Sequence, residues 1–150
     1  MSDRAIIEGH TIRRSILIDA PRASVWAALT EPAQISQWFG DSTHFDTIEV
    51  GAVGTFTWEG YGTFPVVITA LDPMHVFAYR WANEPGGTLG DDSSTLVTFT
   101  LEDVDEATGL TVVETGFEAL AGGTILRRRR LEENRDGWTS ELDELRALFS

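Results

Sequence analysis

Hydrophobic and polar residues alternate from His10 to Asp19, where Ile12, Ile16 and Ile18 share one phase of a two-residue repeat. This repeat is typical of a β-strand with one buried face, because successive side chains of a strand point to opposite sides of the sheet. The segment therefore predicts a first strand between His10 and Asp19.

Two prolines predict a pair of short helices after this strand. Proline lacks an N–H and has a fixed φ, so it ends a strand ladder and suits the first position of a helix. Pro21 therefore predicts a helix to Leu29, and Pro32 predicts the start of a second one. The second helix is expected to run through Ile35 to Trp38 or Phe39 and to end at Gly40.

The pattern from Thr43 to Phe117 changes to short runs rich in β-branched and aromatic residues, separated by glycines and by Asp72-Pro73. Such runs with short connections predict antiparallel hairpins in a meander. The longest connection, residues 83–93, is polar and glycine-rich and is expected to be mobile and to lie at an opening. The predicted strands lie near residues 43–50, 53–59, 62–71, 75–82, 94–102 and 109–117.

The last segment has a helical repeat. Apolar residues recur there at spacings of three and four, which places them on one stripe of a helix that must pack on the sheet. The sequence therefore predicts an α+β fold, in which a curved antiparallel sheet wraps around a long C-terminal helix, in one domain over residues 1–150. The stripe consists of Leu131, Asn134, Trp138, Leu142, Leu145 and Phe149.

The charge balance argues against two classes of binding partner. The 150 residues include 24 acidic and 11 basic side chains, a formal net charge of -13, which argues against nucleic-acid or membrane-surface binding. Cysteine is absent, so there is no thiol chemistry. The segment Met1–His10 has no apolar run typical of a signal peptide, and a cytoplasmic location is expected. The pattern carries no interface signature, and homodimerisation stays open.

Catalytic and cofactor motifs are absent from the sequence. The glycines of 51–54 and 60–62 fit neither a dinucleotide nor a phosphate-binding loop. His10, His44 and His75 lie on separate segments without the spacing of metal ligands, so neither a metal nor a cofactor is expected. The basic run Arg127–Arg130 is interpreted as a solvated helix face, on which Arg128 and Arg129 pair with the glutamates four residues later.

Two residues of the predicted C-terminal helix, Asn134 and Gly137, are unusual at their positions. Asn134 interrupts the helical stripe, and Gly137 lies one turn away in a helix interior, where glycine is unfavourable. Either the two residues line a cavity, or Asn134 meets solvent at the edge of the stripe while Gly137 allows close packing. The sequence alone leaves both alternatives open.

Charged residues also share the inward phase of two strands. Glu114 alternates with Leu110 and Val112, and Arg14 alternates with Ile12 and Ile16. If the strands are neighbours, a buried Arg14–Glu114 ion pair is predicted, either purely structural or orienting the polar end of a ligand. Aromatic residues on the middle strands either pack in the core or stack on a ligand; they are Trp58, Tyr79 and Trp81.

A set of short segments occurs in a characteristic order and spacing over about the whole chain. The segments are Ile16–Pro21, Val25-Trp26, Leu29–Pro32, Trp38–Gly40, Asp72-Pro73, Val113–Phe117 and Gly137-Trp138 with Leu142 and Leu145. Together they resemble the SRPBCC (START/Bet v 1-like) superfamily, and its AHSA1-type branch in particular. This resemblance implies a helix-grip fold that encloses an apolar cavity. The double glycine common in the branch is replaced in this sequence by Gly51-Ala52-Val53-Gly54.

Three hypotheses for function follow. The first is binding of a small hydrophobic, lipid-like or polyketide-like molecule between the sheet and the terminal helix, with no established catalysis. The second is a cyclase- or hydrolase-type enzyme that uses Glu114 or His75 for proton transfer in the same cavity. The third is a stress- or chaperone-related interaction module, which requires an exposed apolar patch. The candidate cavity residues are Arg14, Trp58, Tyr79, Trp81, Glu114, Asn134 and Trp138.

Overall fold

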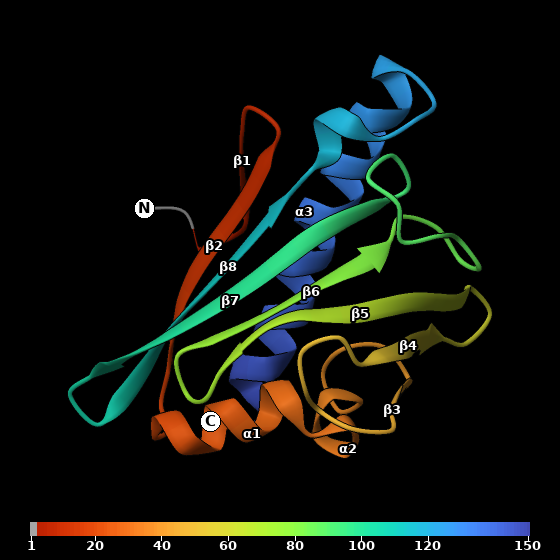
Figure 1. Ribbon diagram of the computed structural model, residues 1–150. Coiled ribbons are helices and arrows are strands. Elements are labelled where there is room, and N and C mark those ends of the chain that lie inside the picture. The colour runs from red at the N-terminus through yellow and green to blue at the C-terminus, as the bar shows by residue number, and fades with distance from the viewer. Residues whose placement is uncertain (1–2) are drawn as a thin grey trace.

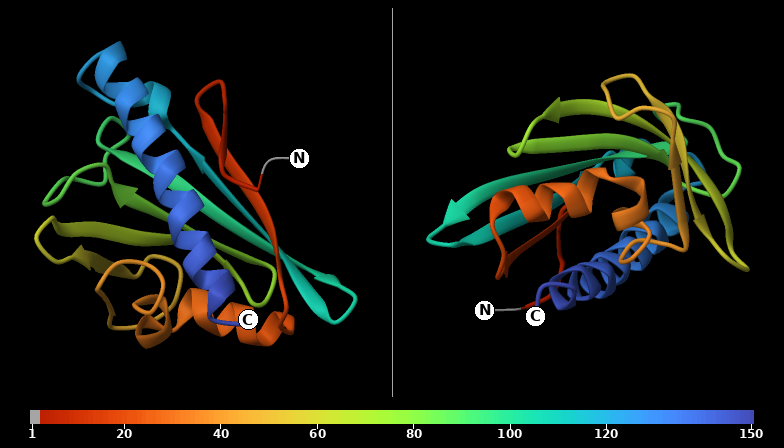
Figure 2. Two further views of the ribbon diagram at one scale, coloured as in Figure 1. Left: turned by 180° about the vertical axis from the view of Figure 1, so that it is seen from behind. Right: turned by 90° about the horizontal axis from the view of Figure 1, so that it is seen from below.

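The computed structural model describes residues 3–150; Met1 and Ser2, part of the segment examined for a signal peptide, lie outside the described residues. One antiparallel sheet curves around a long helix, and two short helices lie across one end of it (Figures 1 and 2). The α+β helix-grip architecture is therefore confirmed. In chain order the elements are β1 Ile6–Glu8, β2 Thr11–Ile18, α1 Arg22–Thr30, α2 Pro32–Ile35, β3 Ser42–Phe45, β4 Val53–Trp58, β5 Gly62–Asp72, β6 Val76–Ala82, β7 Ser94–Val104, β8 Ala107–Thr115, the 3-10 helix η1 Phe117–Ala119, and α3 Thr124–Ala147.

The sheet has eight strands in the order β1-β2-β8-β7-β6-β5-β4-β3, and every neighbouring pair is antiparallel. The six strands from β3 to β8 follow one another in space as in the chain, which confirms the predicted meander. The first predicted strand, β2, pairs with β8, so that Ile12 lies opposite Glu114 and Arg14 opposite Val112. The inward phase of both strands is therefore shared.

The core lies between the concave face of the sheet, α3 and the two short helices (Figure 2). Four residues of the predicted helical stripe are buried against the sheet: Leu131, Trp138, Leu142 and Leu145. Helix α1 contributes Val25 and Leu29 to the same core. No helix within residues 3–150 is both long and apolar enough to cross a membrane.

The largest differences from the sequence predictions concern β1, α2 and β3. The short strand β1 was not predicted; it forms a hairpin with β2 through a turn at Gly9. Helix α2 ends at Ile35, before the predicted Trp38 or Phe39, because the chain turns there to bury both aromatic rings, and the Trp38 indole donates to the Ala28 carbonyl oxygen at 2.9 Å. Strand β3 ends at Phe45, whereas the prediction extended it to residue 50.

Gly54 shows where a strand needs glycine for space. It is buried in β4 between its partners Phe45 on β3 and Val66 on β5, and an added Cβ would collide with the His44 carbonyl oxygen and the Phe45 ring. By contrast, an added Cβ at Gly137 in α3 would meet no atom within 4 Å.

We expect Gly54→Ala and Gly137→Ala to change stability in opposite directions. Overpacking at Gly54 should lower the free energy of unfolding by about 2 kcal/mol. Removing a glycine from the helix interior at Gly137 should raise it by about 0.5–1 kcal/mol. Urea unfolding of the two variants measures both changes. An unchanged midpoint for Gly54→Ala would contradict the packing described here.

Candidate functional site

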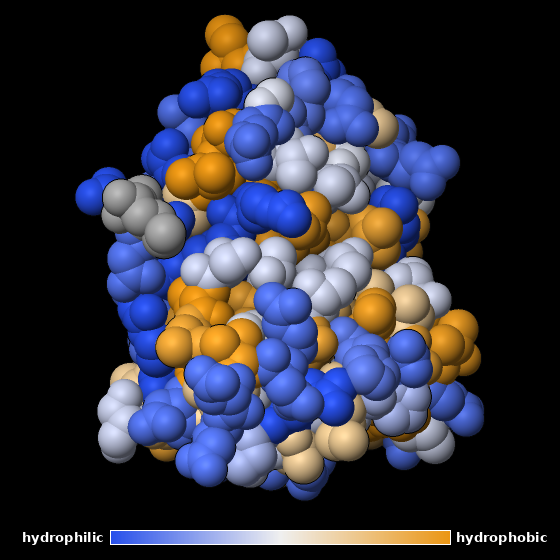
Figure 3. Space-filling view, turned by 90° about the vertical axis from the view of Figure 1, so that its left-hand side faces the viewer, coloured by the Kyte–Doolittle hydropathy of each residue, from blue (hydrophilic) through white to orange (hydrophobic). Residues whose placement is uncertain are grey.

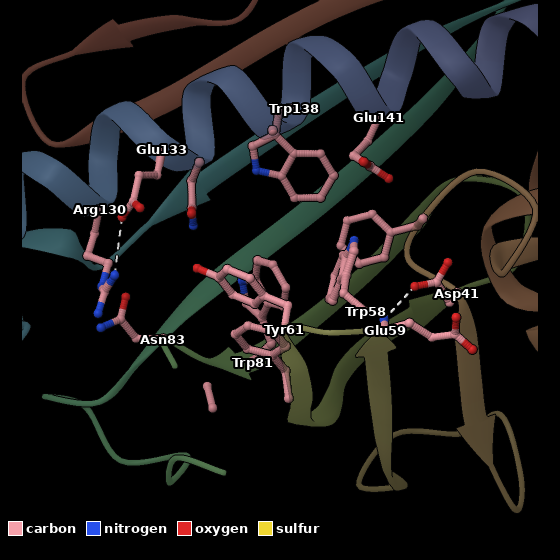
Figure 4. A pocket seen from close by; sticks show the side chains of 15 residues that line it. Asp41, Trp58, Glu59, Tyr61, Trp81, Asn83, Arg130, Glu133, Trp138 and Glu141 are labelled. Atoms are coloured by element: carbon pink, nitrogen blue, oxygen red, sulfur yellow. Dashed lines mark hydrogen bonds and ion pairs between the residues drawn. The ribbon is translucent and has the colours of Figure 1, made fainter. Parts of the chain in front are cut away.

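A cavity of about 370 Å³ lies between α3 and the strands β4, β5 and β6 (Figure 4). It is partly open, and Tyr61, one of the residues that line it, is 65% exposed. Aromatic side chains from four segments form much of the wall. They are Phe39, Trp58, Tyr61, Phe64, Trp81 and Trp138.

The aromatic wall is built by alternation on the strands. Trp58 continues the inward phase of Phe56 on β4, and Trp81 continues that of Tyr79 on β6. The rings contact one another, with centroids 6.0 Å apart for Trp58 and Trp81. Phe39 stacks on Trp138 of α3 at a centroid distance of 5.4 Å and an interplanar angle of 12°. These contacts connect the sheet side of the cavity to the helix side.

A buried carboxylate behind this wall accepts hydrogen bonds from three residues that line the cavity. Glu114 is fully buried on β8, and its Oε1 accepts from the Trp138 indole at 2.8 Å. Its Oε2 accepts from the Trp81 indole at 2.9 Å and from the Thr95 hydroxyl at 2.6 Å. The Asn134 amide Nδ2 donates to both oxygens, at 3.2 and 3.1 Å. Four neutral donors from β6, β7 and α3 therefore satisfy one carboxylate.

Two opposing effects act on the pKa of the Glu114 carboxyl. Burial raises the pKa of its carboxyl above the ordinary value, while hydrogen bonds from Thr95, Trp81, Trp138 and Asn134 lower it. Because two of these donors are indole N–H groups, which cannot accept a hydrogen bond, the geometry suits the ionised carboxylate.

The carboxylate also orients the Asn134 amide. Since Nδ2 faces Glu114, the carbonyl oxygen Oδ1 must point away from it, and this oxygen accepts no hydrogen bond from residues 3–150. Asn134 is half-buried and lines the cavity, as does Gly137 one turn further along α3. Of the two alternatives that the sequence left open, the structure thus has the first, in which Asn134 and Gly137 line a cavity.

The predicted ion pair between Arg14 and Glu114 is wrong. Their positions are two residues apart along paired strands, and the Arg14 guanidinium turns toward α3. It pairs with Asp143 at 2.6 Å and with Asp3 at 3.4 Å, and it donates to the Thr139 carbonyl oxygen at 2.7 Å. Arg14 therefore anchors the helix to β2 and does not line the cavity.

Two further residues named from the sequence also lie outside the main cavity. Tyr79 is packed among Phe56, Phe77 and Phe99 beneath the short helices. His75 is exposed in the turn before β6, where its ring contacts Arg22, so the hypothesis that it transfers protons inside the cavity is wrong. The turn at 73–75 places it near the opposite end of β6 from Trp81.

The basic run at the start of α3 is partly paired with acids, as predicted. Arg128 pairs with Glu132 at 3.6 Å. The predicted partner of Arg129, Glu133, instead pairs with Arg130 at 3.1 Å, and both of these residues line the cavity. One arginine of the run thus belongs to the candidate site, which the sequence analysis did not foresee.

The sequence analysis also missed three carboxylates at the cavity. Asp41 follows α2, Glu59 lies in the turn between β4 and β5, and Glu141 lies on α3 (Figure 4). The Asp41 carboxylate accepts from the Glu59 backbone N–H at 2.5 Å. Burial raises the pKa of Glu141 to about 7, with Glu144 and Asp41 adding to the increase and a hydrogen bond from the Gly40 backbone opposing it. Only Glu141 had a sequence signal, because it is seven residues after Asn134 on the same helical face.

Comparisons with known proteins agree with the architecture described above. Residues 19–150 match the family model described as "Activator of Hsp90 ATPase homolog 1-like protein". The chain belongs to this AHSA1 family. A search of curated proteins finds no match.

Solved structures share the fold of this family member at low sequence identity. Protein MLL2253 from Mesorhizobium loti is 23% identical, with 92% of this chain and 95% of that chain covered and a TM-score of 0.75. CalU16 from Micromonospora echinospora is 22% identical, with 98% and 83% covered and a TM-score of 0.67. The Aha1 dimer from Colwellia psychrerythraea is 20% identical, with 86% and 96% covered and a TM-score of 0.61. At these identities, the likeness concerns the fold alone.

We expect Glu114→Gln to destabilise the protein by about 1–3 kcal/mol. The amide that replaces one carboxylate oxygen would face hydrogen-bond donors, leaving at least one buried indole or hydroxyl without an acceptor. Urea unfolding gives the free energy, and Glu102→Gln on the exposed face of β7 is the matched control. Equal stability of the two variants would contradict the proposed hydrogen-bond pattern.

The raised pKa of Glu141 predicts that ionisation of its carboxyl destabilises the folded protein, to an extent that depends on pH. Between about pH 4.5 and 7 the folded state holds this proton more tightly than the unfolded state, so stability falls as pH rises through this window. Glu141→Gln should therefore gain about 1 kcal/mol relative to the natural protein at pH 8, and less at pH 5. Thermal unfolding at both pH values measures the difference. The exposed control Glu106→Gln should show no such pH dependence.

Proposed function

We propose that this AHSA1 family member binds a small, largely apolar molecule in the cavity between the sheet and α3. The observation that carries the proposal is the aromatic wall, to which both the sheet and the helix contribute. A cavity of about 370 Å³ falls within the usual size of ligand sites, roughly 300–1,000 Å³. Such sites combine an apolar wall with a few polar groups that fix the orientation of the ligand.

Asn134 is the polar group best suited to orient this ligand. Its amide is held by Glu114, which leaves Oδ1 as a free acceptor at the cavity. A ligand that donates a hydrogen bond to Oδ1 would satisfy an atom that has no partner among the described residues. Glu114 is then a positioning residue, because it acts on the ligand only through Trp81, Trp138 and Asn134.

The surroundings of Glu114 favour binding over proton transfer by this residue. Its two oxygens already accept hydrogen bonds from four donors, and its side chain is not part of the cavity wall. A general acid or base must reach the proton that it transfers, directly or through one water. An enzyme that used Glu114 would first have to break this arrangement.

The surface in Figure 3 offers less support for an interaction module. On that face, hydrophobic residues form several small groups separated by hydrophilic ones, whereas docking surfaces usually present one larger patch.

The proposal also includes a cytoplasmic location for this protein. It further includes homodimerisation, since one structure of similar fold is the Aha1 dimer. Light scattering after size exclusion tests the oligomeric state.

Gly137→Leu tests the binding site directly. The new side chain would enter open space at the cavity wall, so we expect the affinity for the neutral probe N-phenyl-1-naphthylamine to fall at least about tenfold, with stability kept or increased. Probe fluorescence in a titration measures the affinity. Ser140→Leu, which adds the same side chain to an exposed position of α3, is the control.

Two results would contradict the proposal. The first is equal probe binding by the natural protein and Gly137→Leu. The second is a natural protein that binds no neutral probe and carries no small molecule by native mass spectrometry after purification from its own host.

A further inference from the structure

Charged groups divide the cavity into two unlike ends (Figure 4). Arg130 and Asn83 lie at one end, with Glu133 paired to Arg130 at 3.1 Å. The carboxylates of Asp41, Glu59 and Glu141 gather at the other end around Trp58. Arg130 at the first end is thus already paired, whereas the described residues that line the second end carry only negative charge.

None of the three carboxylates at the Trp58 end has a salt bridge within residues 3–150. They come from three separate parts of the chain, so no local sequence repeat brings them together. Like charges held close together repel, and the repulsion is stronger beside a low-dielectric wall than in open water. A positive group placed among them would remove this repulsion.

The pKa of Glu141 supports the same conclusion. Burial is its largest cause, and the neighbouring carboxylates Glu144 and Asp41 raise it further. The groups around Glu141 thus disfavour its negative charge as long as no cation is nearby.

The aromatic wall adds a second attraction for the same kind of group. The face of an aromatic ring, and of tryptophan in particular, attracts a cation through its quadrupole. Trp58 is half-buried at the acidic end, and its ring lies near those of Phe39, Phe64 and Trp81, at centroid distances of 5.0, 5.3 and 6.0 Å. A cation at this end can therefore contact both ring surface and carboxylates.

We propose that the ligand of this cavity is an organic cation: an ammonium group attached to an apolar body, with the charge beside Trp58, Asp41, Glu59 and Glu141. The apolar body lies along the aromatic wall toward Asn134 and Trp138. This inference rests on the proposed function, since it names the class of molecule that the same cavity binds.

A series of three probes with one apolar body tests the inference. We choose 1-naphthylmethylamine, 1-naphthylmethanol and 1-naphthylacetate, which are positive, neutral and negative near neutral pH. We expect the amine to bind at least about tenfold more tightly than the alcohol, and the acetate to bind most weakly. Added salt should reduce the advantage of the amine, because it screens the exposed carboxylates. Titration calorimetry gives the three affinities.

The double variant Glu59→Gln/Glu141→Gln provides the matched comparison. It should lose most of the preference for the amine over the alcohol while it still binds the alcohol. The control Glu102→Gln/Glu106→Gln removes the same net charge from exposed positions outside the cavity wall and should keep the preference. If both double variants lose the preference equally, net charge alone attracts the amine, and the assigned position is wrong.

The outcomes separate this inference from the proposed function. Equal affinities for the three probes, or tightest binding of the acetate, would overturn the organic cation and leave the apolar cavity intact. Failure of all three probes together with N-phenyl-1-naphthylamine would overturn the proposed function itself, and the inference with it.

Discussion

The structure depends on how one buried carboxylate is satisfied. Glu114 lies on the inner face of β8 and has no salt bridge with any of residues 3–150, and an isolated charge in such a position would be very unfavourable. Its hydrogen-bond donors come from β6, β7 and α3. To satisfy the charge, the helix must therefore pack on the sheet with one rotation about its axis and one position along it. The carboxylate therefore sets the position of the helix as well as its own hydrogen bonds.

This constraint also shapes the cavity. The two indoles that donate to Glu114 present their remaining surface to the empty space, and the Asn134 amide can turn only one of its ends toward it. A rigid wall reduces the loss of side-chain freedom when a ligand binds. The acidic groups at the Trp58 end lie on loops and on α3, outside this buried pattern, so the charge of the cavity and the geometry of its wall depend on different residues.

The sequence predicted the fold well because the relevant patterns are periodic. The alternation at Ile12, Ile16 and Ile18 and the stripe from Leu131 to Leu145 each report one buried face, and the strands from β3 to β8 pair with their neighbours in the chain. The order of these elements already predicted a curved sheet around the terminal helix, and the resemblance to a known family added the expectation of an enclosed cavity.

The candidate site was less predictable for a physical reason. Alternation places Glu114 and Arg14 on the same inner face, but only the strand register and the path of α3 decide which partner each finds. Asp41 and Glu59 lie in a loop and a turn without a repeat, so nothing local indicates that they share a cavity. Thr95 was overlooked because a threonine on a strand is ordinary until a carboxylate lies diagonally across from it.

The anchor at Arg14 has a consequence for the order of folding. Its guanidinium bonds to the carbonyl oxygens of Trp138 and Thr139, which follow it by 124 and 125 residues in the chain. Contacts between such distant residues form late, because the entropy of closing a long loop must be overcome first. During synthesis on the ribosome, the strands of the sheet are made before α3. The apolar inner face of the sheet would therefore stay uncovered until most of the chain had been made. The cavity, whose wall includes Trp138 of α3, is then among the last parts of the molecule to form.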